Sequence, residues 1–257
     1  MEDLEALAVQ VDDAQREVRA IRQLTKNRPG LTTSEAYAIQ AMSVARRLAR
    51  GEVRIGVKMG LTSRAKMVQV GVDEAAWGRL TNAMLLEEGG TLSKSAFIHP
   101  RLEPEIAFLI KKRLRGKVSP LEALSAVEAI APAMEVIDSR FEKFKFALPD
   151  VVADNTSSSG LVLGAWHQAT SIDFSNLGMV MYVNGRPMQI GSSAAILGHP
   201  LRSLVAAARL TAKWGEALEP GDIVMSGGAT AAHPASVGET ISLEVQHLGG
   251  CSITVEA

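Results

Sequence analysis

Two glutamates that lie two positions apart, Glu103 and Glu105, have the types and spacing in this sequence that most directly suggest chemistry. They stand near the start of the run Arg-Leu-Glu-Pro-Glu-Ile-Ala-Phe-Leu-Ile over residues 101–110, which is apolar enough for a buried strand. Strand side chains alternate between faces, so both carboxylates point into the same space. Because like charges repel in a poorly hydrated place, a divalent cation between them is the economical explanation. The alternative is a solvated strand end with two exposed acids.

A third carboxylate, Glu135, stands in the apolar segment Pro-Ala-Met-Glu-Val-Ile-Asp over residues 132–138. We predict that this segment is a strand and that Glu135 is the third ligand. Three carboxylates without a cluster of histidines favour a hard cation that prefers oxygen, Mg²⁺ or Mn²⁺, over zinc. Asp138, at the end of the segment, is interpreted as a structural hydrogen-bonding residue near the site.

Lys58 is the candidate cationic group of the same site. It lies in the alternating segment Val-Arg-Ile-Gly-Val-Lys-Met-Gly-Leu-Thr over residues 53–62, which predicts a strand with Lys58 and its neighbouring glycines on one face and apolar side chains, among them Ile55, Val57 and Met59, on the other. A lysine with space on both sides can extend across a cavity and present its ammonium group to a ligand. The alternative is an exposed lysine on an edge strand.

A dense polar loop, Val-Val-Ala-Asp-Asn-Thr-Ser-Ser-Ser-Gly over residues 151–160, separates two apolar segments. Its small hydroxyl groups either bind a carboxylate of a ligand or satisfy the backbone groups of a turn. No nucleophile-elbow pattern surrounds these serines, so we predict no serine nucleophile.

The composition indicates a folded α/β body. The chain has 257 residues, 47% of them hydrophobic, which is enough for a substantial core, and its formal net charge of -1 is unlike that of a typical nucleic-acid-binding protein. Cys251 is the only cysteine, which excludes an intrachain disulfide and a multi-cysteine metal site. Neither a signal-peptide pattern nor an apolar run of membrane-spanning length occurs, so we expect a cytoplasmic protein without nucleic-acid or membrane partners.

Hydrophobic periodicity and turn signals predict the elements that position these residues. The sequence predicts helices over residues 4–21, 32–50, 63–69, 121–130 and 200–214, and β-hairpins over 178–190 and 241–255. The hairpin at 178–190 turns at an Asn-Gly pair, and the one at 241–255 at a Gly-Gly pair. We therefore predict an α+β fold in which an N-terminal helical part, residues 1–60, lies on a mixed, largely antiparallel sheet body, residues 61–257, the whole forming either two domains or one continuous domain.

Four segments together resemble the hydratase/decarboxylase branch of the fumarylacetoacetate hydrolase superfamily. They are Gly-Val-Lys-Met-Gly-Leu-Thr at 56–62, Arg-Leu-Glu-Pro-Glu-Ile-Ala-Phe at 101–108, Met-Glu-Val-Ile-Asp-Ser-Arg at 134–140 and Val-Ala-Asp-Asn at 152–155. The resemblance extends over the chain from residue 32 onward and implies the mixed β-roll of that superfamily. It also implies Mg²⁺ or Mn²⁺ held by Glu103, Glu105 and Glu135, with the active-site lysine at Lys58. The stretch Ala-Ala-His-Pro at 231–234 departs from the pattern, which leaves the role of that loop open.

The resemblance implies one of two activities in the meta-cleavage catabolism of aromatic compounds. One is metal-dependent decarboxylation of 2-oxohex-3-enedioate to 2-hydroxypenta-2,4-dienoate and CO₂. The other is hydration of 2-hydroxypenta-2,4-dienoate, the next step. Segments 77–81 and 139–146 are more similar to the decarboxylases, since hydratases commonly carry Asp-Phe-Gly where Trp77-Gly78 stands. A homo-oligomer and a complex with the pathway hydratase are implied by the resemblance alone.

Decarboxylation suits such a site because it needs no nucleophile. The electron pair left by CO₂ moves through the conjugated chain to the C2 oxygen of the substrate, where a metal acts as Lewis acid and Lys58 as an additional donor. Ser157, Thr230 and the backbone N–H groups near Leu61 are the candidates for positioning the substrate carboxylates. A hypothesis of a different class, a non-catalytic partner subunit that docks through the N-terminal helix, also stays open.

Overall fold

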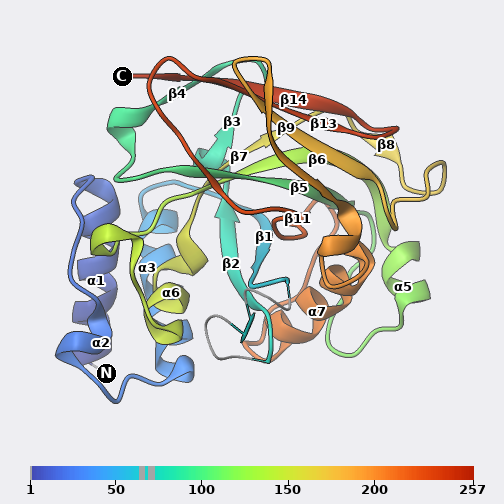
Figure 1. The fold of residues 1–257 in the computed structure, drawn as a ribbon. Helices are drawn as coiled ribbons and strands as arrows, with labels where there is room; N and C mark the ends of the chain where they lie inside the picture. The colour runs from blue at the N-terminus through green and yellow to red at the C-terminus, as the bar shows by residue number, and fades with distance from the viewer. Residues whose placement is uncertain (1, 64–66, 69–72) are drawn as a thin grey trace.

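The computed structural model of the chain describes residues 2–63, 67–68 and 73–257, and it consists of two β-sheets with helices against them (Figure 1). The larger sheet contains, in spatial order, β2 (Ala76–Thr81), β1 (Arg54–Gly60), β11 (Ile223–Met225), β5 (Arg101–Ile110), β6 (Val127–Ile137), β7 (Ser158–Leu163) and β3 (Leu85–Leu86), while β12 (His233–Pro234) pairs with β5 and β8 (His167–Gln168) with β6. The smaller sheet contains β10 (Arg186–Ser192), β9 (Gly178–Val183), β13 (Thr240–Val245), β14 (Gly249–Glu256) and β4 (Thr91–Ser93).

The helices form two groups (Figure 1). The first group contains α1 (Glu2–Arg16), α2 (Leu24–Asn27), α3 (Thr33–Ala49) and α6 (Leu148–Ala153), and the second contains α5 (Pro120–Ser125) and α7 (Pro200–Ala212). Among the described strands, the pairs β1–β11, β3–β7 and β14–β4 are parallel and the others antiparallel. The predicted α+β class with a mixed, largely antiparallel sheet is therefore confirmed.

The larger sheet curls into an incomplete barrel. In the strand order β2 stands at one end and β7 next to the other, yet the two strands contact each other. The concave face is lined by a small apolar cluster of buried side chains from five of the strands: Leu80, Ala107, Ala131, Ala133, Leu161, Ile223 and Met225, joined by Met84. Three of these residues are alanines, whose small side chains fit the narrow space inside the curled sheet.

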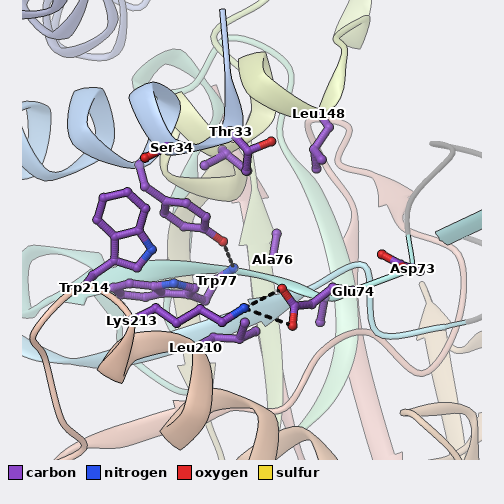
Figure 2. Close-up of a pocket in the computed structure, with 13 residues that line it drawn as sticks. Thr33, Ser34, Asp73, Glu74, Ala76, Trp77, Leu148, Leu210, Lys213 and Trp214 are labelled. Atoms are coloured by element: carbon purple, nitrogen blue, oxygen red, sulfur yellow. Dashed lines mark hydrogen bonds and ion pairs between the residues drawn. The ribbon is translucent and has the colours of Figure 1, made fainter. Parts of the chain in front are cut away.

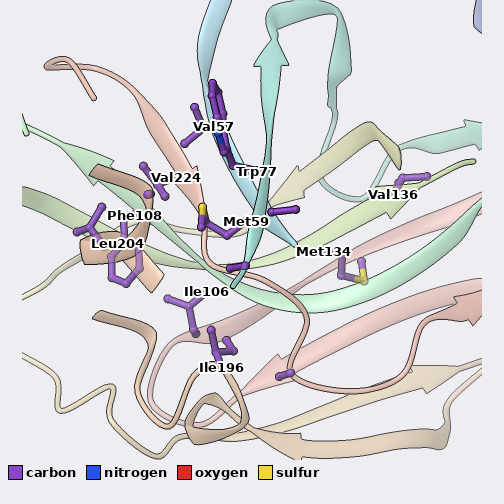
Figure 3. Close-up of a cluster of buried hydrophobic side chains, with 14 of the residues drawn as sticks. Val57, Met59, Trp77, Ile106, Phe108, Met134, Val136, Ile196, Leu204 and Val224 are labelled. Atoms are coloured by element: carbon purple, nitrogen blue, oxygen red, sulfur yellow. The ribbon is translucent and has the colours of Figure 1, made fainter. Parts of the chain in front are cut away.

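The convex face of the same strands carries the main hydrophobic core. Figure 3 shows Val57, Ile106, Met134 and other strand side chains of this core, with Leu204 of α7 near Phe108. In β5 the apolar side chains of Leu102, Ile106 and Phe108 belong to this main core, whereas Ala107 belongs to the concave cluster. The predicted alternation of β5 is thus confirmed.

Two predicted helices are shorter than expected because sheet-type pairing takes their last residues. Helix α1 ends at Arg16, since Ile21 forms a parallel bridge with Phe141 instead of a further helical turn. Helix α5 ends at Ser125, and residues from Val127 onward pair with β5 as strand β6. In both places long-range hydrogen bonds override a local helical pattern.

The strand that contains the candidate lysine is confirmed, but a β-bulge changes which side chains share a face. Gly56 has a φ of +152°, and a Cβ there would lie 1.9 Å from the carbonyl oxygen of Ile223. The register with β2 shifts at this point, so Ile55 packs against the concave cluster rather than the main core. The predicted apolar face therefore holds for Val57 and Met59 but is wrong for Ile55.

The other predicted elements are found with small changes of boundary. Helix α3 begins with the predicted capping box between Thr32 and Glu35, and α7 and both hairpins are present. The predicted turn of the second hairpin at the Gly-Gly pair is wrong, because both glycines pair within β14 and the chain turns at residues 246–248. The short helix predicted over 63–69 lies largely outside the described residues. Strand β1 lies inside the larger sheet, and the domain boundary at residue 60 stays a prediction. None of the helices in the described ranges combines the length and the apolar character needed to span a bilayer.

Candidate active site

Three glutamates meet on the concave face of the curled sheet, beyond the apolar cluster. Strand β5 carries Glu103 and Glu105, β6 carries Glu135, and the antiparallel register sets Glu103 directly opposite Glu135. One carboxylate oxygen from each residue lies within 4.8 Å of the others. Glu105 and Glu135 are fully buried, and Glu103 is 8% exposed. The alternative of a solvated strand end is therefore wrong, whereas the role of the three residues as metal ligands stays a prediction.

The charges of this cluster are held in a desolvated place. Burial, followed by repulsion from Glu135, raises the pKa of the Glu105 carboxyl well above its usual value. Burial also raises the pKa of Glu135, although Lys58 acts in the opposite direction. The Nζ of Lys58 donates to Oε2 of Glu135 over 2.9 Å, and Lys58 is 2% exposed, so it is not an exposed lysine of an edge strand.

The donor atoms of the cluster fit a divalent cation. Oε1 of Glu105 and Oε1 of Glu135 are buried and accept no hydrogen bond from the described residues, although Oε2 of Glu105 accepts one from the N–H of Gly227 over 2.8 Å. A buried carboxylate oxygen without a donor is costly unless a cation takes its place. Mg²⁺ with oxygen ligands at roughly 2.1 Å sets those ligands roughly 3–4 Å apart, a spacing that this cluster can provide.

Two consecutive glycines after β11 make room for the carboxylates. Gly227 has a φ of +106°, and a Cβ at this position would lie 2.0 Å from Oγ1 of Thr62. A Cβ at Gly228 would lie 2.8 Å from the carboxylate of Glu103. The glycine turn that the sequence contains at this point is therefore required by close approach to the site.

We expect Gly227→Ala to lower the affinity for Mg²⁺ by at least about tenfold, because the displaced N–H no longer orients Glu105. The strain at this backbone position is also expected to destabilise the protein by about 1–3 kcal/mol. Titration calorimetry with Mg²⁺ and thermal unfolding measure the two effects. The control is Gly238→Ala, since Gly238 has a φ of +87° but open space at its Cβ position. Unchanged Mg²⁺ affinity in Gly227→Ala, or an equal loss in the control, would contradict the argument.

A pocket of about 630 Å³ leads from Lys58 and Glu103 to the surface. Its other lining residues are Gln23, Gly60, Leu61, Arg101, Ile137, Phe144, Lys145, Phe146, Ala147, Leu148, Val151, Thr156, Ser157, Ala231 and Ala232. Two of the predicted substrate contacts, Leu61 and Ser157, are thus brought to the pocket. Thr230 is not in this lining, and its hydroxyl donates to the carbonyl of Ala231 over 2.9 Å.

The polar loop before β7 presents Ser157 to the pocket. Its three residues Asn155, Thr156 and Ser157 all have left-handed backbone angles, with φ of 49°, 54° and 58°. The side chain of Asn155 bonds both the N–H and the carbonyl of Arg79, and the hydroxyl of Thr156 donates to the carbonyl of Trp77 over 2.8 Å. Oγ of Ser157, in contrast, is buried without a hydrogen-bond partner among the described residues. Thr156 therefore satisfies backbone, and Ser157 is available to a ligand.

A buried ion pair stabilises the base of this loop. The guanidinium of Arg140 pairs with the carboxylate of Asp154 and donates to Oγ of Ser159 over 2.6 Å. The carboxylate of Asp138 accepts the N–H groups of Ile98 and His99 over 2.8 and 2.7 Å. Asp138 is therefore a structural hydrogen-bonding residue, as predicted.

Three residues of the pocket wall, Arg101, Phe144 and Lys145, were not predicted as site residues. Arg101 precedes Glu103 by two positions in β5, so the alternation that identified the glutamates also pointed to it. Phe144 and Lys145 lie on the segment between β6 and α6, and no local pattern linked them to the site.

A second pocket, of about 400 Å³, lies between α3, α7 and β2 (Figure 2). Tyr37, Trp77 and Trp214 form its aromatic wall, and the hydroxyl of Tyr37 accepts the backbone N–H of Trp77. Of the two acids that line it, Asp73 and Glu74, the second pairs with the lysine, since Nζ of Lys213 lies 3.0 Å from a carboxylate oxygen of Glu74. The buried carboxylate oxygens that have no hydrogen-bond partner among the described residues lie at the glutamate cluster, so we assign the candidate active site to that cluster.

Comparisons with known proteins agree with this geometry. Residues 55–256 match the family described as fumarylacetoacetate (FAA) hydrolase C-terminal. The chain is 54% identical over 248 residues to a 4-oxalocrotonate decarboxylase from Pseudomonas sp, an alignment that covers 96% of each chain. It is 35% identical to a 2-hydroxyhexa-2,4-dienoate hydratase from Comamonas testosteroni, over 94% of this chain and 93% of the relative.

The solved structures include a very similar fold. The 4-oxalocrotonate decarboxylase from Pseudomonas putida G7, complexed with magnesium and adipate, matches with a TM-score of 0.97 and 39% identity, over 99% of this chain and 97% of that chain. The same enzyme complexed with calcium and acetate matches with a TM-score of 0.95 and 38% identity, at the same coverage. Sequence and fold together show that this chain belongs to the fumarylacetoacetate hydrolase family.

Proposed function

We propose that this chain is a metal-dependent decarboxylase that converts 2-oxohex-3-enedioate (4-oxalocrotonate) to 2-hydroxypenta-2,4-dienoate and CO₂. The observation that carries the proposal is the cluster of three buried glutamates, two of which have oxygens without a donor in the described part of the chain, beside a buried lysine at the base of a pocket. The higher identity to a decarboxylase than to a hydratase supports it. So does the bound adipate of the similar decarboxylase structure, since adipate is a dicarboxylate of the same length as the substrate.

In this proposal Glu103, Glu105 and Glu135 would hold Mg²⁺ or Mn²⁺, which supplies Lewis-acid stabilisation for negative charge on the C2 oxygen when it is bound. Lys58, held by Glu135, keeps a second positive charge beside the oxygen on which that charge develops. The C5–C6 bond of the substrate breaks and CO₂ leaves. The electron pair shifts the two double bonds along the chain to the C2 oxygen, which takes a proton to give the 2-hydroxydiene.

The remaining predicted contacts position the substrate. The hydroxyl of Ser157 and the backbone near Leu61 would hold the C1 carboxylate, because both line the pocket that opens from Lys58. Thr230 stays a predicted contact of the same kind. Since the glutamates and Lys58 are almost completely buried, the charged end of the substrate is separated from bulk water, which strengthens each electrostatic contact.

The second candidate function is hydration of 2-hydroxypenta-2,4-dienoate, which the 35% identity to a hydratase supports. Hydration needs a group near the distal end of the substrate that transfers a proton. The ionisable residues that line the described pocket beyond Lys58 and Glu103 are Arg101 and Lys145, two cations suited to binding a carboxylate. This lining favours a dicarboxylate substrate and hence the decarboxylase.

A paired-substrate assay tests the function. With Mg²⁺ or Mn²⁺ the purified protein is expected to release one CO₂ for each 2-oxohex-3-enedioate consumed. Removal of the metal with a chelator should abolish this release, and added metal should restore it. Water addition to 2-hydroxypenta-2,4-dienoate without CO₂ release would replace the decarboxylase by the hydratase. No turnover of either substrate would favour the non-catalytic partner subunit.

We also infer that the chain forms a homo-oligomer in the cytoplasm and associates with the hydratase of its pathway. Exposed apolar side chains on the edge strand β10, Met188 and Ile190, support the first inference, with 53% and 76% of their surface accessible. The buried thiol of Cys251 suits a reducing compartment. The product of the proposed reaction is the substrate of the hydratase, which supports their association. Light scattering of the protein alone and mixed with that hydratase tests both associations.

A further inference from the structure

Arg101 is a cation inside the candidate pocket that no carboxylate of the described residues neutralises. Its side chain lines the pocket together with Lys58 and Glu103. The guanidinium carbon lies 4.2 Å from the centre of the Phe144 ring, which also lines the pocket. Arg101 is half-buried, whereas the buried arginines Arg140 and Arg79 pair with the carboxylates of Asp154 and Glu216. Among the described residues that line the pocket, Arg101 is therefore the arginine whose guanidinium has no carboxylate partner and can bind an anion from outside the chain.

The position of Arg101 in β5 fits one end of a six-carbon dicarboxylate. It lies two residues before Glu103 on the same face of the strand, and two strand residues span roughly 6.6 Å. The two carboxyl carbons of an extended six-carbon dicarboxylate are roughly 6 Å apart, given single bonds of about 1.5 Å. When the 2-oxo acid end of such a molecule lies at the glutamates, its other end reaches the level of Arg101.

We propose that Arg101 binds the distal carboxylate of the substrate and so selects dicarboxylic over monocarboxylic 2-oxo acids. This inference rests on the proposed function, which places the 2-oxo acid end at the glutamate cluster. The planar guanidinium can donate two parallel hydrogen bonds to a carboxylate. The ring of Phe144 lies against the guanidinium, which limits its orientations and excludes water from that side.

The contact between Arg101 and the distal carboxylate acts on substrate affinity and specificity rather than on the rate of the chemical step. The distal carboxylate loses its charge as it becomes CO₂, so its bond to Arg101 is stronger in the bound substrate than in the transition state. Such a contact lowers KM without raising kcat. Lys145, at the exposed rim of the pocket, is screened by solvent and is expected to contribute less.

The test compares two unreactive ligands of equal length, 2-oxohexanedioate and 2-oxohexanoate, which differ in the distal carboxylate. We expect the Mg²⁺-loaded wild-type protein to bind the dicarboxylate about 10- to 100-fold more tightly in titration calorimetry, the range for a charge-assisted hydrogen bond. Arg101→Met should remove this preference while leaving the affinity for 2-oxohexanoate and for Mg²⁺ unchanged. In turnover of 2-oxohex-3-enedioate the same variant should show a raised KM and a kcat equal to or above that of wild type.

Two further variants make the result specific. Arg101→Lys keeps the charge and should retain part of the preference for the dicarboxylate. Arg113→Met removes an exposed arginine that pairs with Glu219 and should change neither affinity. An equal loss of both ligands in Arg101→Met, or no preference in the wild type, would overturn the assignment of Arg101. If the Mg²⁺-loaded wild type binds neither 2-oxo acid, the proposed function itself fails, and this inference falls with it.

Discussion

Glu105→Gln is expected to abolish decarboxylation while making the metal-free protein more stable. Loss of one charged ligand should lower the affinity for Mg²⁺ and the rate of decarboxylation by at least about 100-fold. The same change removes a fully buried carboxylate that repels Glu135, so the metal-free protein should gain about 0.5–2 kcal/mol in free energy of unfolding. Calorimetric Mg²⁺ titration, CO₂ release and denaturant unfolding measure the three effects.

The gain in unfolding free energy of metal-free Glu105→Gln should depend on pH. Burial raises the pKa of the Glu105 carboxyl well above its usual value of 4.5, so the folded protein holds this proton more tightly than the unfolded chain. The contribution of Glu105 to stability is therefore complete below pH 4.5 and is lost as the pH rises through the folded pKa. In metal-free protein we expect wild-type stability to fall over this range more steeply than the stability of Glu105→Gln.

Glu128→Gln is the matched control, since Glu128 lies on β6 like Glu135 but has 57% of its side chain exposed. It should change Mg²⁺ affinity, activity and stability little. A Glu105→Gln protein that binds Mg²⁺ as tightly as wild type would show that Glu105 is not a ligand. If Glu105→Gln instead makes the metal-free protein less stable, the charge of Glu105 is compensated in wild type without a metal.

Lys58→Met is expected to act on stability in the opposite direction. The ammonium group of Lys58 donates to Glu135 over 2.9 Å in a site with almost no solvent contact. Its removal leaves a buried carboxylate unpaired, which costs about 3–5 kcal/mol of unfolding free energy in the metal-free protein. Decarboxylation should fall by about 10²–10³-fold, because the oxygen that gains negative charge loses a donor.

Added Mg²⁺ should restore part of the stability of Lys58→Met, since a cation then compensates the glutamates. Thermal unfolding with and without Mg²⁺ measures this restoration, and Lys58→Arg, which keeps the charge, provides a second variant if the first does not fold. The control is Lys111→Met, because Lys111 is 42% exposed and pairs with Glu128 at 3.7 Å; it should cost less than about 1 kcal/mol. Wild-type activity in Lys58→Met would remove this residue from the proposed mechanism.

In the proposed mechanism the two ends of the pocket have different roles, and this difference would account for two activities in one family. The glutamates and Lys58 would treat the 2-oxo acid end alike in a decarboxylase and a hydratase, since both reactions develop charge on the C2 oxygen. The distal end of the substrate differs, because a decarboxylase must hold a second carboxylate and a hydratase must transfer a proton. The pocket wall with Arg101 and Phe144 is therefore where we expect the specificity of this chain to reside.

The sequence by itself determined that Glu103 and Glu105 share a face. It also predicted Glu135 and Lys58 as further residues of the same site. These predictions depend on the alternation of side chains in a strand, which is a local property of the backbone. Capping of α3 by Thr32 and the Asn-Gly hairpin are local in the same sense and were also predicted. The three carboxylates alone already predicted Mg²⁺ or Mn²⁺, and the resemblance to the superfamily added the activity.

Only the tertiary structure decided which side chains meet across strands and where a helix ends and the following strand begins. The register that sets Glu135 opposite Glu103 comes from hydrogen bonds between strands, and the same pairing ends α5 at Ser125. The hydroxyl of Ser157 is buried without a hydrogen-bond partner among the described residues, which its loop sequence alone does not reveal. The contact between Arg101 and Phe144 joins segments far apart in the chain. Such contacts depend on long-range packing, which a local pattern does not encode, and they decide how the pocket around the predicted glutamates is shaped.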